Sequence, residues 1–146
     1  KKLRDLMRLA ARRDVPVLVH GSEPVGHDYA GKGDTDPATL LGLAEAFPKN
    51  RLIFAHWGGG LPFYALMPEV RKALANTYFD TAASPFLYQQ SVFRTVANAA
   101  GMERVLFGSD YPLLRPKRVA EQAMSGLTSK QAAEVLGGNA KALLGL

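Results

Sequence analysis

The amino-acid sequence predicts an α/β fold built on a parallel sheet of four strands. Four short apolar runs begin near residues 15, 51, 77 and 104, and they have the length and the β-branched or aromatic content of buried strands. Apolar residues at helical spacing follow each run. Strands that alternate with helices pair in parallel through right-handed crossovers. The chain is therefore predicted to form either an open four-stranded sheet or one half of an eight-stranded barrel.

The composition is that of a globular chain with a substantial core. Of the 146 residues, 47% are apolar, and no linker, repeat or low-complexity stretch divides them, so residues 1–146 are predicted to form a single domain. No apolar run approaches the roughly 18 residues of a membrane span. The chain contains no cysteine, which excludes disulfides and thiolate metal sites within it and favours the cytoplasm as its compartment.

The net charge of +5 does not indicate a nucleic-acid-binding protein. Six of the 18 lysine and arginine residues lie in the first 13 positions, on what is predicted to be one exposed helix face. Aromatic residues are not interleaved with basic residues, as they are on RNA-binding surfaces. We therefore expect a small-molecule substrate as partner, and neither nucleic acid nor a membrane.

The first third of the chain is predicted to contain a helix, a strand, a long loop and a second helix. Lys2 to Arg13 has apolar residues at the spacing of an amphipathic helix. Val15 to Val19 is an apolar strand that ends in His20. The polar segment Ser22 to Asp36 has no periodicity, and a loop of this length in a small domain is more often functional than idle. Asp36 followed by Pro37 is typical of a helix start.

The middle of the chain centres on the sequence RLIFAHWGGGLP, residues 51–62. Its apolar run is the clearest strand in the chain, and it ends in His56. The three glycines that follow allow a sharp turn and the close approach of another group. A helix is predicted over Leu61 to Leu74, interrupted or divided in two at Pro68, and a third strand over Thr77 to Ala83.

The last third is predicted to contain one strand and four helices. The strand is Arg104 to Phe107, and Gly101 is predicted to cap the helix before it. Thr128 is predicted to be the N-cap of a helix, and Gly137 and Gly138 to separate the last two helices. The helices are predicted over Phe86 to Ala100, Pro116 to Met124, Ser129 to Leu136 and Asn139 to Leu144.

Three of the four predicted strands end in side chains that bind metals or move protons: His20, His56 and Asp110. The carboxyl ends of parallel strands lie on one rim, so these groups are predicted to converge. Imidazole and carboxylate are common ligands of Zn²⁺, Mn²⁺ and Fe²⁺. In the alternative interpretation Asp110 caps the following turn and the two imidazoles bond to loop carbonyls. The third strand is predicted to end in Thr81 and Ser84, without such a group.

Other residues near these strand ends are candidates for substrate contact. They are His27 in the polar loop, Trp57 next to His56, and Tyr111 next to Asp110. For Trp57 and Tyr111 the sequence leaves open whether the ring packs in the core or lines the pocket. The glycine triplet could hold a phosphate at a helix N-terminus, but no Walker or Rossmann pattern accompanies it, so phosphate binding is not predicted.

Four segments, taken in order, carry a family resemblance: VLVH, LIFAHWGGG, VLFGSDYP and LGGNAKALLGL. They resemble the C-terminal half of the amidohydrolase superfamily, in the amidohydrolase-related branch that contains aminocarboxymuconate semialdehyde decarboxylase and γ-resorcylate decarboxylase. The resemblance implies a TIM (β/α)8 barrel of a metal-dependent hydrolase, of which this chain would form strands five to eight. It also implies one catalytic divalent metal, most often Zn, with Mn or Fe as alternatives.

The resemblance also implies roles for individual residues. His20 and Asp110 would be metal ligands, His56 would polarise the substrate or an activated water, and Asp110 would in addition transfer a proton. Members of the superfamily carry a His-x-His pair on the first strand, and this sequence has none. With two ligands in place of the usual three or four, the metal is expected to be weakly held or missing.

The expected reaction is hydrolysis of a C–N or C–O bond, or non-oxidative decarboxylation of a small carboxylic acid. The alternative is a catalytically inactive half-barrel or interaction module with a vestigial metal site. A third possibility, an independent flavodoxin-like domain, would require a phosphate or nucleotide at the glycine turns. A half-barrel exposes two strand edges and an apolar inner face. We therefore expect the chain to pair with itself or with a missing N-terminal half-barrel.

Overall fold

The computed structural model, which describes residues 1–26, 28–30 and 32–146, contains a parallel four-stranded sheet. The strands lie side by side in the order in which they occur along the chain. This arrangement confirms the predicted α/β class and the parallel sheet. The strands are β1 (Val17–Val19), β2 (Leu52–Phe54), β3 (Thr77–Asp80) and β4 (Val105–Leu106).

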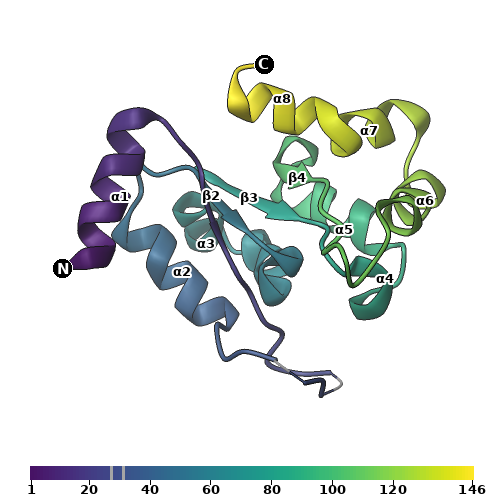
Figure 1. Cartoon of the computed structure of the whole chain (residues 1–146), viewed down its shortest axis with the longest axis horizontal. Helices are drawn as coiled ribbons and strands as arrows, with labels where there is room; N and C mark the ends of the chain where they lie inside the picture. Colours follow the sequence, from purple (N-terminus) through teal and green to yellow (C-terminus); the bar gives the residue numbers. More distant parts are fainter. Residues whose placement is uncertain (27, 31) are drawn as a thin grey trace.

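Helices connect the strands, and Figure 1 shows α1 and α2 at one end of the sheet and α6 and α7 at the other. The α-helices are α1 (Lys2–Arg13), α2 (Pro37–Ala46), α3 (Pro68–Ala73), α4 (Ser84–Leu87), α5 (Val92–Ala100), α6 (Pro116–Gly126), α7 (Ser129–Ala133) and α8 (Asn139–Leu144). Two 3₁₀ segments, η1 (His56–Leu66) and η2 (Met102–Arg104), and one π-helical turn, η3 (Glu134–Gly138), complete the described elements.

The predicted helix starts at Asp36 and Thr128 are confirmed. The side chain of Asp36 accepts a hydrogen bond of 2.8 Å from the amide of Thr39, and Pro37 occupies the first turn of α2. Thr128 and Gln131 form a reciprocal capping box at α7. Because such bonds satisfy amides that have no partner inside a helix, they fix where each helix begins.

One predicted helix is divided in the structure, and two predicted breaks are confirmed. The helix predicted over Phe86 to Ala100 is two helices, α4 and α5, because the backbone is extended at Tyr88. The separation of the last two helices predicted at Gly137 and Gly138 is confirmed, because Gly137 has non-helical backbone angles and forms a kink within η3, between α7 and α8. The division predicted at Pro68 is confirmed, because Pro68 begins α3 after η1 has ended.

The two faces of the sheet differ in burial. One face carries Leu52, Phe54, Phe79 and Val105, which are almost completely buried beneath the helices. On the other face Leu18, Ile53 and Tyr78 are aligned across three strands, and the Leu18 side chain is 62% exposed. In parallel sheets of α/β proteins both faces are normally buried. The open face is therefore the inner surface expected of a half-barrel.

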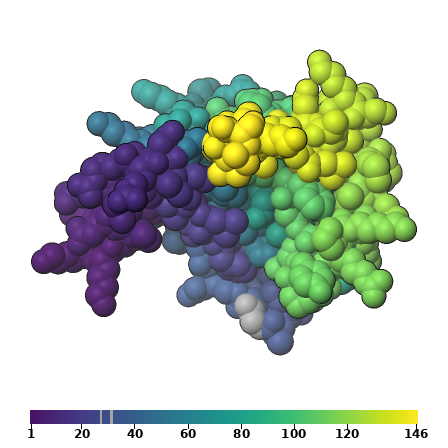
Figure 2. Space-filling model, turned by 45° about the horizontal axis from the view of Figure 1, so that its top comes forward, coloured from purple at the N-terminus to yellow at the C-terminus, as the bar shows by residue number. Residues whose placement is uncertain are grey.

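Arg51, immediately before β2, contacts two parts of the chain that are far apart in sequence. Its guanidinium donates to the carbonyls of Asp14 and Leu143, and it pairs with the Asp14 carboxylate at 3.0 Å. Figure 2 shows the N-terminal and C-terminal segments on the same side of the molecule. In the part of the chain that the structure describes, no helix is long and apolar enough to cross a membrane.

Candidate active site

The three side chains predicted from the strand ends lie in one cavity. His20, His56 and Asp110 line a cavity of about 470 Å³ at the carboxyl ends of β1, β2 and β4. Tyr29, from the loop after β1, lines the same cavity. The parallel topology thus brings these residues together, as expected from the order of strands and helices.

The two imidazoles contact each other edge to face, with ring centroids 4.9 Å apart. Nδ1 of His56 lies 3.2 Å from the carbonyl oxygen of Ala82. Because a carbonyl can only accept, this bond requires the proton on Nδ1, which leaves Nε2 of His56 as the nitrogen available to a ligand. The carbonyl partner that the alternative interpretation expected is therefore present at His56. Nε2 of His20 lies 3.0 Å from the Ser22 hydroxyl.

The backbone after β2 is left-handed over five consecutive residues, His56 to Gly60, with φ angles between 55° and 97°. Only glycine adopts this region at little cost, so His56 and Trp57 must be held there by other contacts. The turn makes two neighbouring side chains diverge. His56 reaches the cavity, whereas Trp57 is completely buried.

Asp80 supplies one of the contacts that hold this turn. Its Oδ1 accepts hydrogen bonds from the amides of His56 (2.9 Å) and Ala82 (3.0 Å). Burial raises the pKa of the Asp80 carboxyl, the nearby Asp110 charge adds to the rise, and the two amides and His56 oppose it. A buried carboxyl group between two catalytic candidates therefore fixes the position of His56.

The prediction that the third strand ends without an ionisable group is wrong, because Asp80 is the last residue of β3. The signal was present in the sequence TYFDTAA, in which Asp80 is the only charged residue in an otherwise apolar and hydroxyl-bearing run. A lone acid inside a buried strand needs partners, and here backbone amides supply them.

The glycines after His56 admit the backbone of the loop that follows β1. A Cβ atom on Gly59 would lie 2.2 Å from the carbonyl oxygen of Ser22, which is far inside van der Waals contact. Gly21 also lies close to this turn, since its Cβ would lie 2.9 Å from the carbonyl oxygen of Ala55. The close approach expected at the glycines is therefore the approach of this loop.

The residues predicted to contact substrate lie in different parts of the molecule. The interpretation of Trp57 as a lining residue is corrected, because its indole packs edge to face on Phe93 and donates a 3.0 Å hydrogen bond to Ser84 in the core. Tyr111 is 73% exposed beside Asp110, on the surface at the end of β4. His27 lies outside the described residues.

Tyr29 is a cavity residue that the sequence analysis did not select. Its hydroxyl donates to Oε2 of Glu23 at 3.4 Å. Burial, and then the negative charges of Glu23 and Asp110, raise the pKa of the Tyr29 hydroxyl. No feature of the loop sequence distinguished this tyrosine, because its position depends on how the loop folds back over the strand ends.

The donor atoms of the cavity suit a divalent cation but do not enclose one. Imidazole nitrogen and carboxylate oxygen are the ligand types that Zn²⁺ and Mn²⁺ accept. Among residues 1–26, 28–30 and 32–146, however, no group of three or more His, Asp or Glu side chains is arranged to hold a metal ion. These residues therefore fit one part of a coordination sphere.

Comparison with known proteins assigns the family. A family model described as amidohydrolase matches residues 2–146. The chain belongs to the amidohydrolase family. The chain is 28% identical to 6-methylsalicylic acid decarboxylase of Penicillium expansum, in a match that covers 70% of this chain and 40% of that protein. The family assignment confirms the resemblance inferred from the four sequence segments, and it makes the chain a member of an enzyme family.

Solved structures confirm that the fold is part of a TIM barrel. A TIM-barrel protein from Bordetella bronchiseptica superposes with a TM-score of 0.72 and 21% identity, over 99% of this chain and 50% of its own. A dihydroxybenzoic acid decarboxylase from Polaromonas sp. JS666, solved with manganese and 2-nitroresorcinol, has a TM-score of 0.73 and 19% identity, over 95% of this chain and 52% of its own. An amidohydrolase from Burkholderia multivorans with bound zinc has a TM-score of 0.69 and 15% identity, over 96% of this chain and 56% of its own. The chain thus spans about half the length of these structures.

Proposed function

We propose that this chain forms strands five to eight of a metal-dependent decarboxylase that acts on a small aromatic acid. The convergence of His20, His56 and Asp110 on one cavity is the observation that carries the proposal. The relatives whose names specify a reaction act on 6-methylsalicylic acid and dihydroxybenzoic acid, which supports decarboxylation over hydrolysis and a hydroxybenzoic acid as substrate.

In this proposal His20 and Asp110 hold the metal from opposite edges of the sheet. The manganese and zinc in the two neighbouring structures support a divalent cation. When bound, such an ion acts as a Lewis acid on substrate oxygen atoms. His56 presents Nε2 to the substrate because its Nδ1 is held by Ala82. Asp110 takes a proton from solvent and delivers it to the ring carbon, whose bond to the carboxylate carbon breaks to release CO₂.

Metal titration tests the proposal. In calorimetry with MnCl₂ and with ZnCl₂ we expect the wild-type chain to bind weakly, because it supplies only two of the ligands. His20→Ala and Asp110→Asn should each weaken binding at least about tenfold, since each removes a direct ligand. His56→Gln should retain metal binding, and Asp5→Asn on exposed α1 is the matched control for loss of an acid.

Unchanged affinity in both ligand variants would contradict the metal site. Absence of binding by the wild-type chain at every concentration would favour a half-barrel without catalytic function. Where the metal binds, incubation with 2,6-dihydroxybenzoate and measurement of released CO₂ tests the reaction class on the same sample.

The open sheet face gives a second test, of the proposal that further strands complete the barrel. An N-terminal half-barrel would cover Leu18 and Ile53 and pair with the free edges of β1 and β4. On its own the chain is expected to self-associate through this apolar face, as measured by size-exclusion chromatography with light scattering. Leu18→Glu should shift the chain toward monomer, whereas Leu66→Glu, exposed outside the sheet, should not. A wild-type chain that remains monomeric at high concentration would contradict this.

A further inference from the structure

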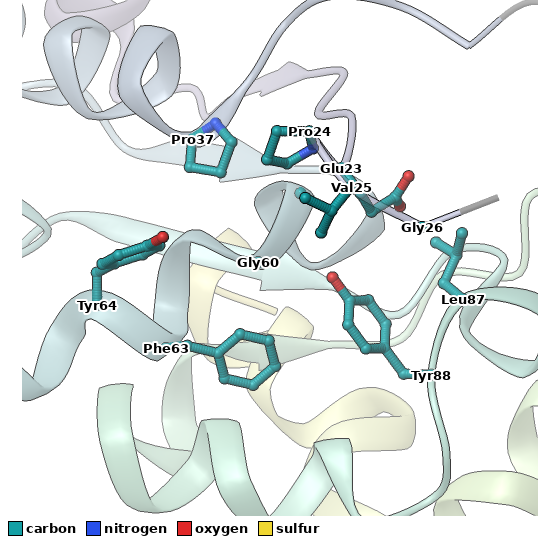
Figure 3. Close-up of a pocket in the computed structure, with 11 residues that line it drawn as sticks. Glu23, Pro24, Val25, Gly26, Pro37, Gly60, Phe63, Tyr64, Leu87 and Tyr88 are labelled. Carbon is teal, nitrogen blue, oxygen red and sulfur yellow. The ribbon is translucent and has the colours of Figure 1, made fainter. Parts of the chain in front are cut away.

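A second cavity lies beside the candidate active site and is formed entirely by this chain. Its volume is about 320 Å³, within the range of small-molecule sites. The loop after β1, the start of α2, the 3₁₀ segment η1 and the end of α4 enclose it, as Figure 3 shows. None of His20, His56 and Asp110 lines it. Its lining includes one carboxylate, that of Glu23.

Glu23 is an incompletely satisfied acid. Its side chain is only 9% exposed, and the Tyr29 hydroxyl donates to Oε2. Oε1 is buried and accepts no hydrogen bond from the described residues. A buried carboxylate oxygen without a donor is costly, so such atoms normally have a partner. None of the described residues donates a hydrogen bond to this oxygen.

The walls around this carboxylate are aromatic. Phe63 and Tyr88 pack edge to face with ring centroids 5.9 Å apart, and Tyr64 lines the cavity on the side away from Tyr88. The Tyr88 hydroxyl points toward the segment that carries Glu23. Burial and the Glu23 charge raise the pKa of Tyr88 to about 12, so this hydroxyl remains neutral and polar at physiological pH.

Gly60 keeps the floor of the cavity open. It has a φ of 97°, and a Cβ atom there would lie 3.4 Å from the Tyr88 hydroxyl and 3.6 Å from the Phe63 ring. A side chain at this position would therefore occupy the space between the two rings. The site combines a largely buried carboxylate and aromatic rings that line one free volume.

We propose that this cavity binds a primary organic ammonium, with the cation on the Glu23 carboxylate and its apolar body against Phe63 and Tyr88. An ammonium group donates to a carboxylate in a charge-assisted bond, which is stronger than a neutral one. Aromatic rings attract cations through their faces. The negative charge of Glu23 disfavours anions, so the site excludes the carboxylic acids proposed as substrates of the neighbouring cavity. The amine site stands independently of the metal site.

Calorimetry with 2-phenylethylammonium chloride tests the proposal directly. A fragment of this size should bind the wild-type chain with a dissociation constant of about 0.1–1 mM. The neutral analogue 2-phenylethanol, which has the same body, should bind about 10- to 100-fold more weakly, and 3-phenylpropionate should not bind. Glu23→Gln should lower the ammonium affinity by the same factor. Glu45→Gln, an exposed acid on α2, is the matched control and should have no effect.

A second measurement keeps the test decisive if Glu23→Gln folds poorly. In the wild-type chain, amide NMR shifts on titration with 2-phenylethylammonium should be largest at Gly60, Phe63 and Tyr88. The proposal is overturned if the alcohol binds as tightly as the ammonium, if Glu23→Gln binds with wild-type affinity, or if the shifts cluster at His20 and Asp110. Absence of ammonium binding up to about 10 mM would also overturn it and leave water as the partner of Glu23.

Discussion

Replacing Gly59 by alanine is expected to destabilise the chain by about 3–5 kcal/mol, the largest effect among the substitutions considered for its stability. The new Cβ would lie 2.2 Å from the Ser22 carbonyl oxygen and 2.7 Å from the Ser22 carbonyl carbon. Neither atom can move without shifting the backbone that carries His20 and Glu23. The left-handed φ of 61° adds about 1–2 kcal/mol for any residue with a Cβ atom. Urea unfolding followed by circular dichroism measures the loss.

Gly26→Ala is the matched control for this change. Gly26 also has a positive φ, 98°, but a Cβ atom there would meet no atom of the described residues within 4 Å. It should therefore show only the conformational cost, about 1–2 kcal/mol. If the two variants lose the same stability, the contact between the glycine turn and the loop after β1 is not what requires glycine at position 59.

Replacing Asp80 by alanine is expected to cost about 2–4 kcal/mol, because the amides of His56 and Ala82 lose their common acceptor. The left-handed conformation of His56 and Trp57 loses a restraint at the same time. Thermal and urea unfolding measure the change. The metal affinity of the chain should change less than in His20→Ala, since Asp80 acts through the position of His56 and is not proposed as a ligand.

Asp80→Asn separates the hydrogen bonds from the charge. Its amide oxygen can accept from both backbone amides, so this variant should be at least as stable as the wild type at pH 7. The pKa of Asp80 is raised above its ordinary value of 3.8, so its favourable contribution is fully present below that pH and is lost as the pH rises through the folded-state pKa. The stability of the wild type relative to Asp80→Asn should thus fall over this interval and then level off. A relative stability that increases with pH would contradict the raised pKa.

Much of the fold follows from features that the sequence displays locally. The apolar runs at β1 to β4, the caps at Asp36 and Thr128 and the break at Pro68 each depend on a few neighbouring residues. The convergence of His20, His56 and Asp110 then requires only that the strands be parallel. These predictions succeeded because the physical cause of each element lies within or next to it.

The residues that the sequence analysis left open or did not select depend on contacts that only the folded chain creates. Trp57 is in the core because a left-handed turn directs it toward Phe93, 36 positions further along the chain. Tyr29 and Glu23 gain their roles from the fold of a long loop, for which no periodicity exists. Asp80 was missed because a charged residue at the end of a short strand is informative only once its amide partners are known.

The left-handed turn after β2 also bears on how such a protein can change over evolutionary time. His56 contacts the proposed substrate cavity and Trp57 the core, although they are neighbours in the chain. Mutations of His56, which would alter the proposed chemistry, and mutations of Trp57, which would alter stability, therefore affect adjacent codons. Because both residues share one backbone conformation, an insertion or deletion here would alter both properties together. Sequence change in this segment should consequently consist of substitutions, and insertions and deletions should be rare.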